Sequence, residues 1–140
     1  MAGRWSLVAG RWSLVGANMT IKSYKDLKVW QVAIDMVVDI YRLTGKFPRN
    51  ESFGLASQIQ RATVSIPSNI AEGHARGTSR EFHHYLSITL GSTAELETQL
   101  IIASKLGYLE KTTANEMLER IDKLGKMIRA LQKSVKIGCQ

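Results

Sequence analysis

The chain has 140 residues, a formal net charge of +7 and a single cysteine. This length is typical of one domain that buries its own core, and one cysteine excludes a disulfide framework. No apolar run approaches the roughly 20 residues of a membrane-spanning helix. Arginine and glycine interrupt the N-terminal segment, which therefore lacks the apolar core of a signal peptide, and we expect a cytoplasmic protein.

The N-terminal segment contains a repeat, since Ala-Gly-Arg-Trp-Ser-Leu-Val occurs at residues 2–8 and again at residues 9–15. Two copies of seven residues are too few for a solenoid. We therefore predict a poorly ordered extension over residues 1–20, a folded domain over residues 21–137 and a tail over residues 138–140.

Apolar residues recur at helical spacing from Tyr24 onward, first in two segments separated by a Phe-Pro pair. The first predicted helix ends near Gly45, and the second runs from about residue 52 to residue 72, with Gly73 as its C-terminal stop. Pro67 lies inside the second segment, where a proline costs about 3 kcal/mol and needs compensating contacts. The predicted core seam of the first helix is Leu27, Trp30, Ile34, Val37 and Tyr41. The seam of the second is Leu55, Ile59, Ala62, Ile66 and Asn69.

The rest of the chain predicts two more helices, each with an N-terminal cap. Thr78 and Glu81 form a capping box that opens the third helix, and Gly107 closes it. Thr113 and Glu116 are the predicted cap of the fourth helix. The seam of the third helix is Phe82, Leu86, Thr89, Thr93, Leu96, Leu100 and Ala103. The seam of the fourth is Met117, Ile121, Leu124, Ile128, Leu131 and Val135.

These patterns predict an all-α protein, because no strand-like alternation competes with them. Short connections favour antiparallel neighbours, so the expected fold is an up-down-up-down four-helix bundle. Surplus apolar residues off the first and third seams would leave an exposed apolar patch on a monomer, and we therefore predict a homo-oligomer. The surplus residues are Val29, Val32, Val38 and Ile40 in the first helix and Ile88, Ile101, Ile102 and Leu106 in the third.

Positive charge is concentrated near the C-terminus, where residues 111–140 hold seven lysines and arginines against three acidic residues. Cations of the fourth helix centre on the side opposite its apolar seam, and such a strip can follow a phosphate backbone. We predict nucleic-acid contact there; the alternative is a face that is merely solvated, as in a protein–protein adaptor that binds no nucleic acid. The predicted contact residues are Arg120, Lys123, Lys126, Arg129, Lys133 and Lys136.

A polar face is predicted on the second helix, where Arg61, Ser65, Asn69 and Glu72 recur at steps of four, four and three. Glu95 on the third helix, together with the nearby Glu97, is a candidate partner of Arg61. We interpret this cluster as a satisfied polar network around Pro67, and a ligand-binding or catalytic cluster is the alternative. Gly91, inside the third helix, is interpreted as the point where a neighbouring helix approaches closely.

Catalytic and metal-binding patterns receive no support from the spacing of reactive residues. His74, His83 and His84 lack a metal-ligand spacing, and no Gly-rich phosphate loop occurs. Cys139 lies outside the predicted bundle with no paired base. We therefore expect a non-enzymatic protein with no cofactor and no membrane partner.

Several motifs carry a family resemblance. They are Tyr-Lys-Asp-Leu-Lys-Val-Trp at residues 24–30, Phe-Gly-Leu at 53–55, Gln-Ile-Gln-Arg-Ala at 58–62, Ser-Ile-Pro-Ser-Asn-Ile-Ala-Glu-Gly at 65–73 and Gly-Ser-Thr-Ala-Glu-Leu-Glu at 91–97. Together they resemble the bacterial four-helix-bundle proteins first described as products of intervening sequences in large-subunit ribosomal RNA genes. The resemblance covers about residues 21–131.

The resemblance implies a homopentameric barrel of up-down bundles and no catalytic residue. The nearest functional relatives it implies are the accessory variability proteins of diversity-generating retroelements, which are basic pentamers that associate with nucleic acid and a reverse transcriptase. Taken with the charge distribution, it favours a homo-oligomeric scaffold that binds RNA or DNA.

Overall fold

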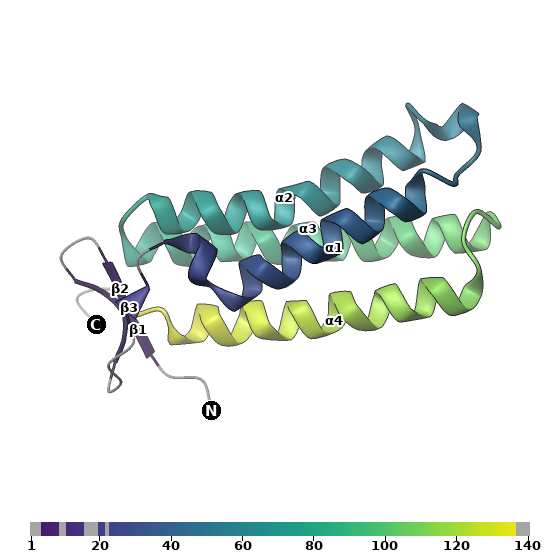
Figure 1. Cartoon of the computed structure of the whole chain (residues 1–140). Coiled ribbons are helices and arrows are strands. Elements are labelled where there is room, and N and C mark those ends of the chain that lie inside the picture. The colour runs from purple at the N-terminus through teal and green to yellow at the C-terminus, as the bar shows by residue number, and fades with distance from the viewer. Residues whose placement is uncertain (1–3, 9–10, 16–19, 22, 137–140) are drawn as a thin grey trace.

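The structure, a computed structural model of the chain, describes residues 4–8, 11–15, 20–21 and 23–136. Its main body is a bundle of four helices that run side by side in alternating directions (Figure 1). α1 and α3 each pack against both α2 and α4. The predicted antiparallel four-helix bundle is therefore confirmed. The four helices are α1 (Lys28–Thr44), α2 (Leu55–Ala75), α3 (Ser79–Lys105) and α4 (Lys111–Ser134).

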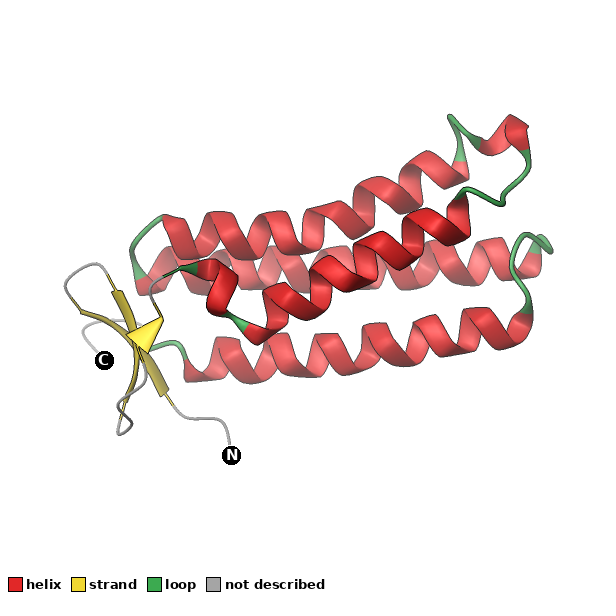
Figure 2. Cartoon of the chain, viewed as in Figure 1, coloured by secondary structure: helices red, strands yellow, loops and turns green. Residues whose placement is uncertain are grey.

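Two short 3-10 helices, η1 (Tyr24–Asp26) and η2 (Arg49–Glu51), lie at the two ends of α1 (Figure 2). Glu51 connects three segments of this region. One carboxylate oxygen accepts a hydrogen bond from the backbone N–H of Leu55 at 3.2 Å, and the other accepts from the Tyr108 hydroxyl at 2.8 Å. The same side chain thus satisfies the first turn of α2 and fixes the connection between α3 and α4. Among the described helices none combines the length and apolar character that crossing a bilayer requires.

The N-terminal repeat differs from the expected poorly ordered extension, because its described residues form a small antiparallel sheet. The strands are β1 (Arg4–Val8), β2 (Arg11–Val15) and β3 (Thr20–Ile21), in the order β1-β2-β3. The two copies of the repeat pair with each other, with Ser6 opposite Ser13. Tryptophan and valine favour strands, and the two residues that separate β1 from β2 match the length of a tight hairpin connection. Leu7 packs against the bundle core. The tail predicted over residues 138–140 lies outside the described residues.

The buried face of α1 is not the predicted one. The buried positions are shifted by one residue, or about 100° around the helix, from the predicted seam. Met36 and Ile40 are therefore fully buried, while Tyr41 is 45% exposed. Trp30, Ile34 and Val37 are only half-buried. α1 is apolar on both candidate faces, and the face that packs against α2 and α4 is the one that carries the smaller Ala33. The buried residues of α1 are Val29, Ala33, Met36, Ile40 and Thr44.

α2 continues as one helix through Pro67, which is itself buried. Two side chains of the motif bond to neighbouring carbonyl oxygens: the Ser65 hydroxyl donates to Ala62 at 2.6 Å and the Asn69 amide donates to Ser65 at 2.7 Å. The prediction that Gly73 ends the helix is wrong, because α2 runs on to Ala75. The left-handed conformation that stops it belongs instead to Gly77, with φ of 80°.

The seam of α3 is confirmed at every predicted position, and that of α4 at every position except Leu131, which is half-buried. The Thr78 hydroxyl accepts a hydrogen bond from the backbone N–H of Glu81 at 3.1 Å, as a cap of α3 should. Gly107 follows α3 with φ of 81°. The predicted cap of α4 at Thr113 is wrong, since α4 begins earlier, at Lys111, with Glu110 as its N-cap residue.

Candidate nucleic-acid interface

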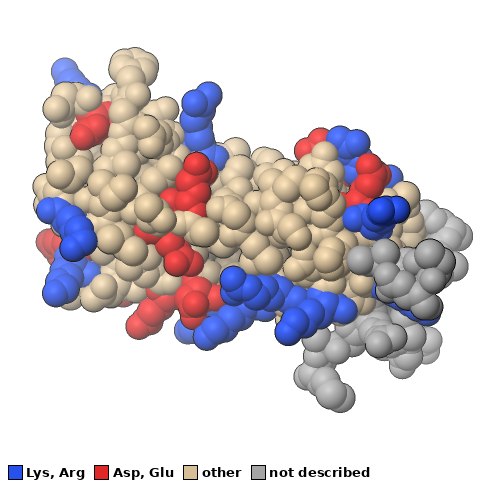
Figure 3. Space-filling view, turned by 180° about the vertical axis from the view of Figure 1, so that it is seen from behind, with Lys and Arg blue, Asp and Glu red and all other residues tan. Residues whose placement is uncertain are grey.

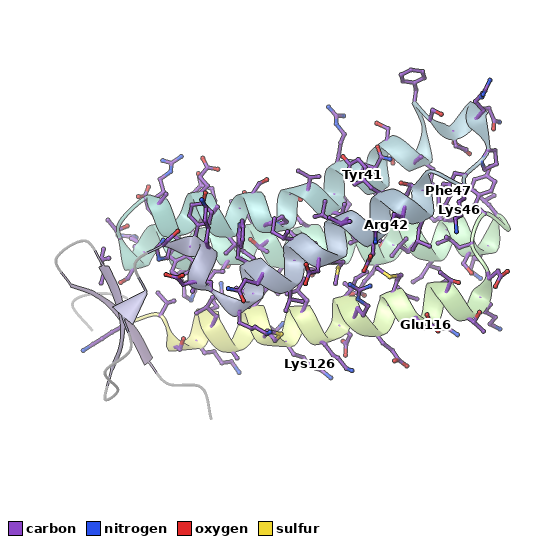
Figure 4. The ribbon with its side chains drawn as sticks, in the orientation of Figure 1. Tyr41, Arg42, Lys46, Phe47, Glu116 and Lys126 are labelled. Atoms are coloured by element: carbon purple, nitrogen blue, oxygen red, sulfur yellow. The ribbon has the colours of Figure 1, made fainter. Side chains whose placement is uncertain are left out.

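α4 carries apolar side chains on one side and basic side chains on the other. Ile121, Leu124 and Ile128 are fully buried on one side. Four cations of α4 are exposed on the other side, at intervals of three or four residues, and a fifth, Lys136, which the sequence predicted on the helix, is exposed just after α4 ends. Figure 4 shows Lys126 projecting from α4 away from the other helices. We refer to these exposed cations as the basic ridge; they are Lys123, Lys126, Arg129, Lys133 and Lys136.

Arg120 does not belong to the basic ridge, although the sequence predicted it there. Its guanidinium donates to the Asp39 carboxylate of α1 at 2.9 Å, and both side chains are 39% exposed. A second hydrogen bond joins it to the Met117 sulfur at 3.5 Å. The arginine therefore tethers α4 to α1, and its charge is compensated within the bundle. Asp39 is 81 residues earlier in the chain, so this pairing is invisible to an analysis of α4 spacing.

Charge within the ridge is almost uncompensated. Lys126 forms an ion pair with Asp122 at 3.0 Å, but the two side chains are 73% and 61% exposed. Such an exposed pair contributes about 0–1 kcal/mol and exchanges readily for another anion. The other four ridge cations form no ion pair with a described carboxylate.

Acidic and basic residues divide α4 into two halves. Glu116, Glu119 and Asp122 precede the ridge, and no acidic residue follows Asp122 in the sequence. Figure 3 shows the result along the lower edge of the molecule, where acidic side chains gather toward one end and basic side chains continue from the middle toward the end that carries the N-terminal sheet. An anionic ligand is thereby attracted to the C-terminal half of α4 and repelled from its N-terminal half.

The polar network predicted on α2 is not formed. Arg61, Glu72 and Glu95 are exposed, and no hydrogen bond or ion pair between described residues joins Arg61 to either acid. Glu72 instead pairs with Arg76 at 3.1 Å. Asn69 is half-buried and bonds to its own helix, because Ile70 occupies the core position expected for it.

A groove of about 350 Å³ lies between α1 and α2, next to part of this polar face. Asn69 and Glu72 do not line it, so the cluster does not converge on a common cavity. The lining residues are Tyr41, Ser57, Gln60, Arg61, Val64 and Ser65.

His74 lies near the end of α2, where the Asp26 carboxylate partly opposes the effect of burial on its pKa, and His83 and His84 lie in α3. Burial lowers the pKa of His74, and its ring meets the edge of Phe82 with 5.6 Å between ring centroids. Within the described residues no group of three or more histidine, cysteine, aspartate or glutamate side chains is placed to hold a metal ion. Cys139 lies outside the described residues.

Comparison with known proteins identifies relatives of the bundle. The sequence profile described as "23S rRNA-intervening sequence protein" matches residues 25–130. Among solved structures, the chain is similar to a protein of unknown function from the S23 ribosomal protein family of Bacteroides thetaiotaomicron VPI-5482, with a TM-score of 0.70 and 22% identity over 75% of this chain and 95% of that one. At that identity the likeness shows a common fold. No curated protein matches the chain significantly.

Proposed function

The chain belongs to the 23S rRNA-intervening sequence protein family, and from this premise we propose that it is a non-enzymatic, homo-oligomeric scaffold that binds the phosphate backbone of nucleic acid through its basic ridge. The name of the family associates it with ribosomal RNA. The observation that carries the proposal is the run of five exposed cations, four on α4 and Lys136 just after it, of which one has a carboxylate partner among the described residues.

Phosphate contact is the chemistry that this surface supports best. Lysine and arginine heads that line one side of a helix can neutralise successive phosphates and release condensed counterions. The ridge presents no aromatic side chain on the described part of α4 for stacking against bases. Binding is therefore expected to show a strong salt dependence and little sequence preference.

Oligomerisation is supported by exposed apolar side chains on two helices, including Val38 of α1 and Ile102 of α3. Assembly would place one ridge on each subunit, so that a long nucleic acid meets several ridges and gains avidity. The pentameric state and the reverse-transcriptase partner implied by the resemblance to accessory variability proteins stay predictions.

A matched pair of triple charge reversals tests the proposal. Lys126, Arg129 and Lys133 are changed to glutamate in one variant; Lys28, Lys46 and Arg49, which are also exposed, are changed to glutamate in the control. Affinity for a fluorescent structured RNA is measured by anisotropy at about 0.1 M salt. The ridge variant should bind about 100-fold more weakly, because three phosphate contacts each add about 0.7–0.9 to the salt exponent.

The control variant has the same net charge as the ridge variant and should retain most of the affinity. Equal losses in both variants would show that overall charge, not the ridge, governs binding. If the unaltered protein binds no RNA even at low salt, the alternative function is favoured, in which the protein is a protein–protein adaptor and the ridge cations only contact water.

A further inference from the structure

The groove between α1 and α2 is surrounded by apolar side chains that no described residue covers. Val38 and Tyr41 of α1 and Val64 of α2 are 38–45% exposed. Tyr41 and Val64 line the groove itself, and Figure 4 shows Tyr41 at the boundary with α2. Arg61 lines the same groove and has no ion-pair partner among the described residues. The surface thus combines a groove of mixed polar and apolar lining, partly exposed apolar side chains and one cation without a described carboxylate partner.

A second uncovered surface runs along α3. Ile88, Glu95 and Ile102 are spaced by seven residues and therefore lie on one side of the helix, with Leu106 one turn further. The three apolar residues are 39–55% exposed, and Glu95 has no ion-pair partner among the described residues. We call this surface the α3 stripe; it consists of Ile88, Gly91, Glu95, Ile102 and Leu106.

Gly91 lies within the α3 stripe and has no explanation inside the bundle. A Cβ added there would meet no described heavy atom within 4 Å, so the close approach of a neighbouring helix expected from the sequence does not occur among the four described helices. A glycine in a helix interior costs about 1 kcal/mol relative to alanine. A glycine at this exposed position would allow another molecule to approach the α3 backbone closely.

The two surfaces belong to different helices and carry opposite charges, Arg61 in the groove and Glu95 on the α3 stripe. One is a hollow whose arginine has no ion-pair partner among the described residues; the other is an exposed apolar stripe whose glutamate likewise has none, with open space at Gly91. Contact between two different surfaces of identical chains is head-to-tail, and repeated contacts of this kind close into a ring or extend as a filament.

We propose that the α3 stripe of one chain docks into the α1–α2 groove of a second copy, with Glu95 opposite Arg61 and Gly91 at the point of closest approach. The inference deepens the oligomeric part of the proposed function by naming its contact surfaces. It requires nothing of the basic ridge, whose residues lie on and just after α4 and belong to neither surface.

A charge swap tests the pairing. Arg61→Glu and Glu95→Arg each place like charges opposite each other, which costs several kcal/mol at an interface, whereas the double variant restores opposite charges. Mass is measured by light scattering after gel filtration. The unaltered protein should be a multiple of its 15.6 kDa chain mass, each single variant should shift to the monomer mass, and the double variant should reassemble. Lys111→Glu and Glu116→Arg, exposed on α4, are the matched controls and should leave the mass unchanged.

Gly91→Gln provides an independent test in which folding and assembly respond in opposite directions. The monomer offers open space for the new side chain, so the helix should become more stable, while the docked copy should be displaced. The inference is overturned if the unaltered protein is a monomer, or if the single variants keep its mass. It is also overturned if the double variant stays monomeric, or if the Gly91→Gln variant assembles normally. Mass and RNA affinity are also measured on the variant with Lys126, Arg129 and Lys133 changed to glutamate, which should keep the mass of the unaltered protein and lose RNA binding. Unchanged RNA binding with unchanged mass would count against the basic ridge and leave the docking inference standing.

Discussion

Replacing Gly73 with alanine should destabilise the bundle, although alanine is the better helix former. Gly73 is a buried residue of α2, and an added Cβ would lie 2.5 Å from the Tyr85 Cβ and 3.3 Å from Phe82 Cδ1 on α3. The Tyr85 Cβ is attached directly to the α3 backbone, so it cannot swing away like the tip of a long side chain. Relief therefore requires α2 and α3 to move apart.

The magnitude follows from two opposing effects. Alanine stabilises a helix interior by up to about 1 kcal/mol relative to glycine. Optimal carbon–carbon contacts lie near 3.5–4.0 Å, and overpacking a tight core costs about 1–3 kcal/mol or more. We expect Gly73→Ala to lower the free energy of unfolding by about 1–2 kcal/mol, which for a domain of this size lowers the Tm by roughly 3–8 °C.

Urea and thermal unfolding followed by circular dichroism measure this loss at fixed protein concentration. Gly125→Ala is the matched control: Gly125 is also buried in a helix, but its added Cβ would meet only an Arg129 nitrogen at 3.9 Å. The control should therefore gain up to about 1 kcal/mol. A Gly73→Ala variant as stable as the unaltered protein, or more so, would refute the close approach of α2 and α3 at this residue.

The remaining predictions concern the Arg120–Asp39 ion pair, the Tyr108–Glu51 hydrogen bond and the half-buried His74. Arg120→Gln breaks the Asp39 ion pair and should lower the free energy of unfolding in urea by up to about 1 kcal/mol. RNA affinity should stay within about twofold of the unaltered protein, and a larger loss would show that Arg120 contacts RNA. The Glu51 carboxylate raises the pKa of Tyr108, so Glu51→Gln should lower that pKa in an ultraviolet titration, and an unchanged titration would contradict the hydrogen bond. Because this pKa is raised on folding, its stabilising contribution is lost only above about pH 10. Burial lowers the pKa of His74, so stability should fall as pH drops below about 6.5, and His74→Gln should reduce that fall; equal pH profiles for both proteins would contradict it.

The sequence predicted the fold, and it predicted α3 and α4 more accurately than α1. α4 has one apolar side, so Ile121, Leu124 and Ile128 could face only the core. α1 is apolar on two adjacent sides. Periodicity alone could not decide whether the side with Met36 and Ile40 or the side with Tyr41 faces the core. That choice depends on packing against α2 and α4, which local spacing does not contain.

The motif around Pro67 shows a similar limit. Its residue types correctly indicated an unusual stretch of helix, but the bonds of Ser65 and Asn69 to their own backbone replaced the expected network between helices. The role of Gly73 depends on Tyr85 of another helix. Sequence spacing likewise predicted the exposed side of α4 and missed that Arg120 pairs with Asp39 across the bundle.

The salt dependence of RNA binding is the measurement that tests the basic ridge most directly. If all five ridge cations contact phosphates, log affinity should fall against log salt concentration with a slope of about −3.5 to −4.5 per bound chain. The variant with Lys126, Arg129 and Lys133 changed to glutamate should lose about 2–3 of that slope. A slope near zero in the unaltered protein, or the same slope in the ridge variant, would contradict nucleic-acid binding through α4.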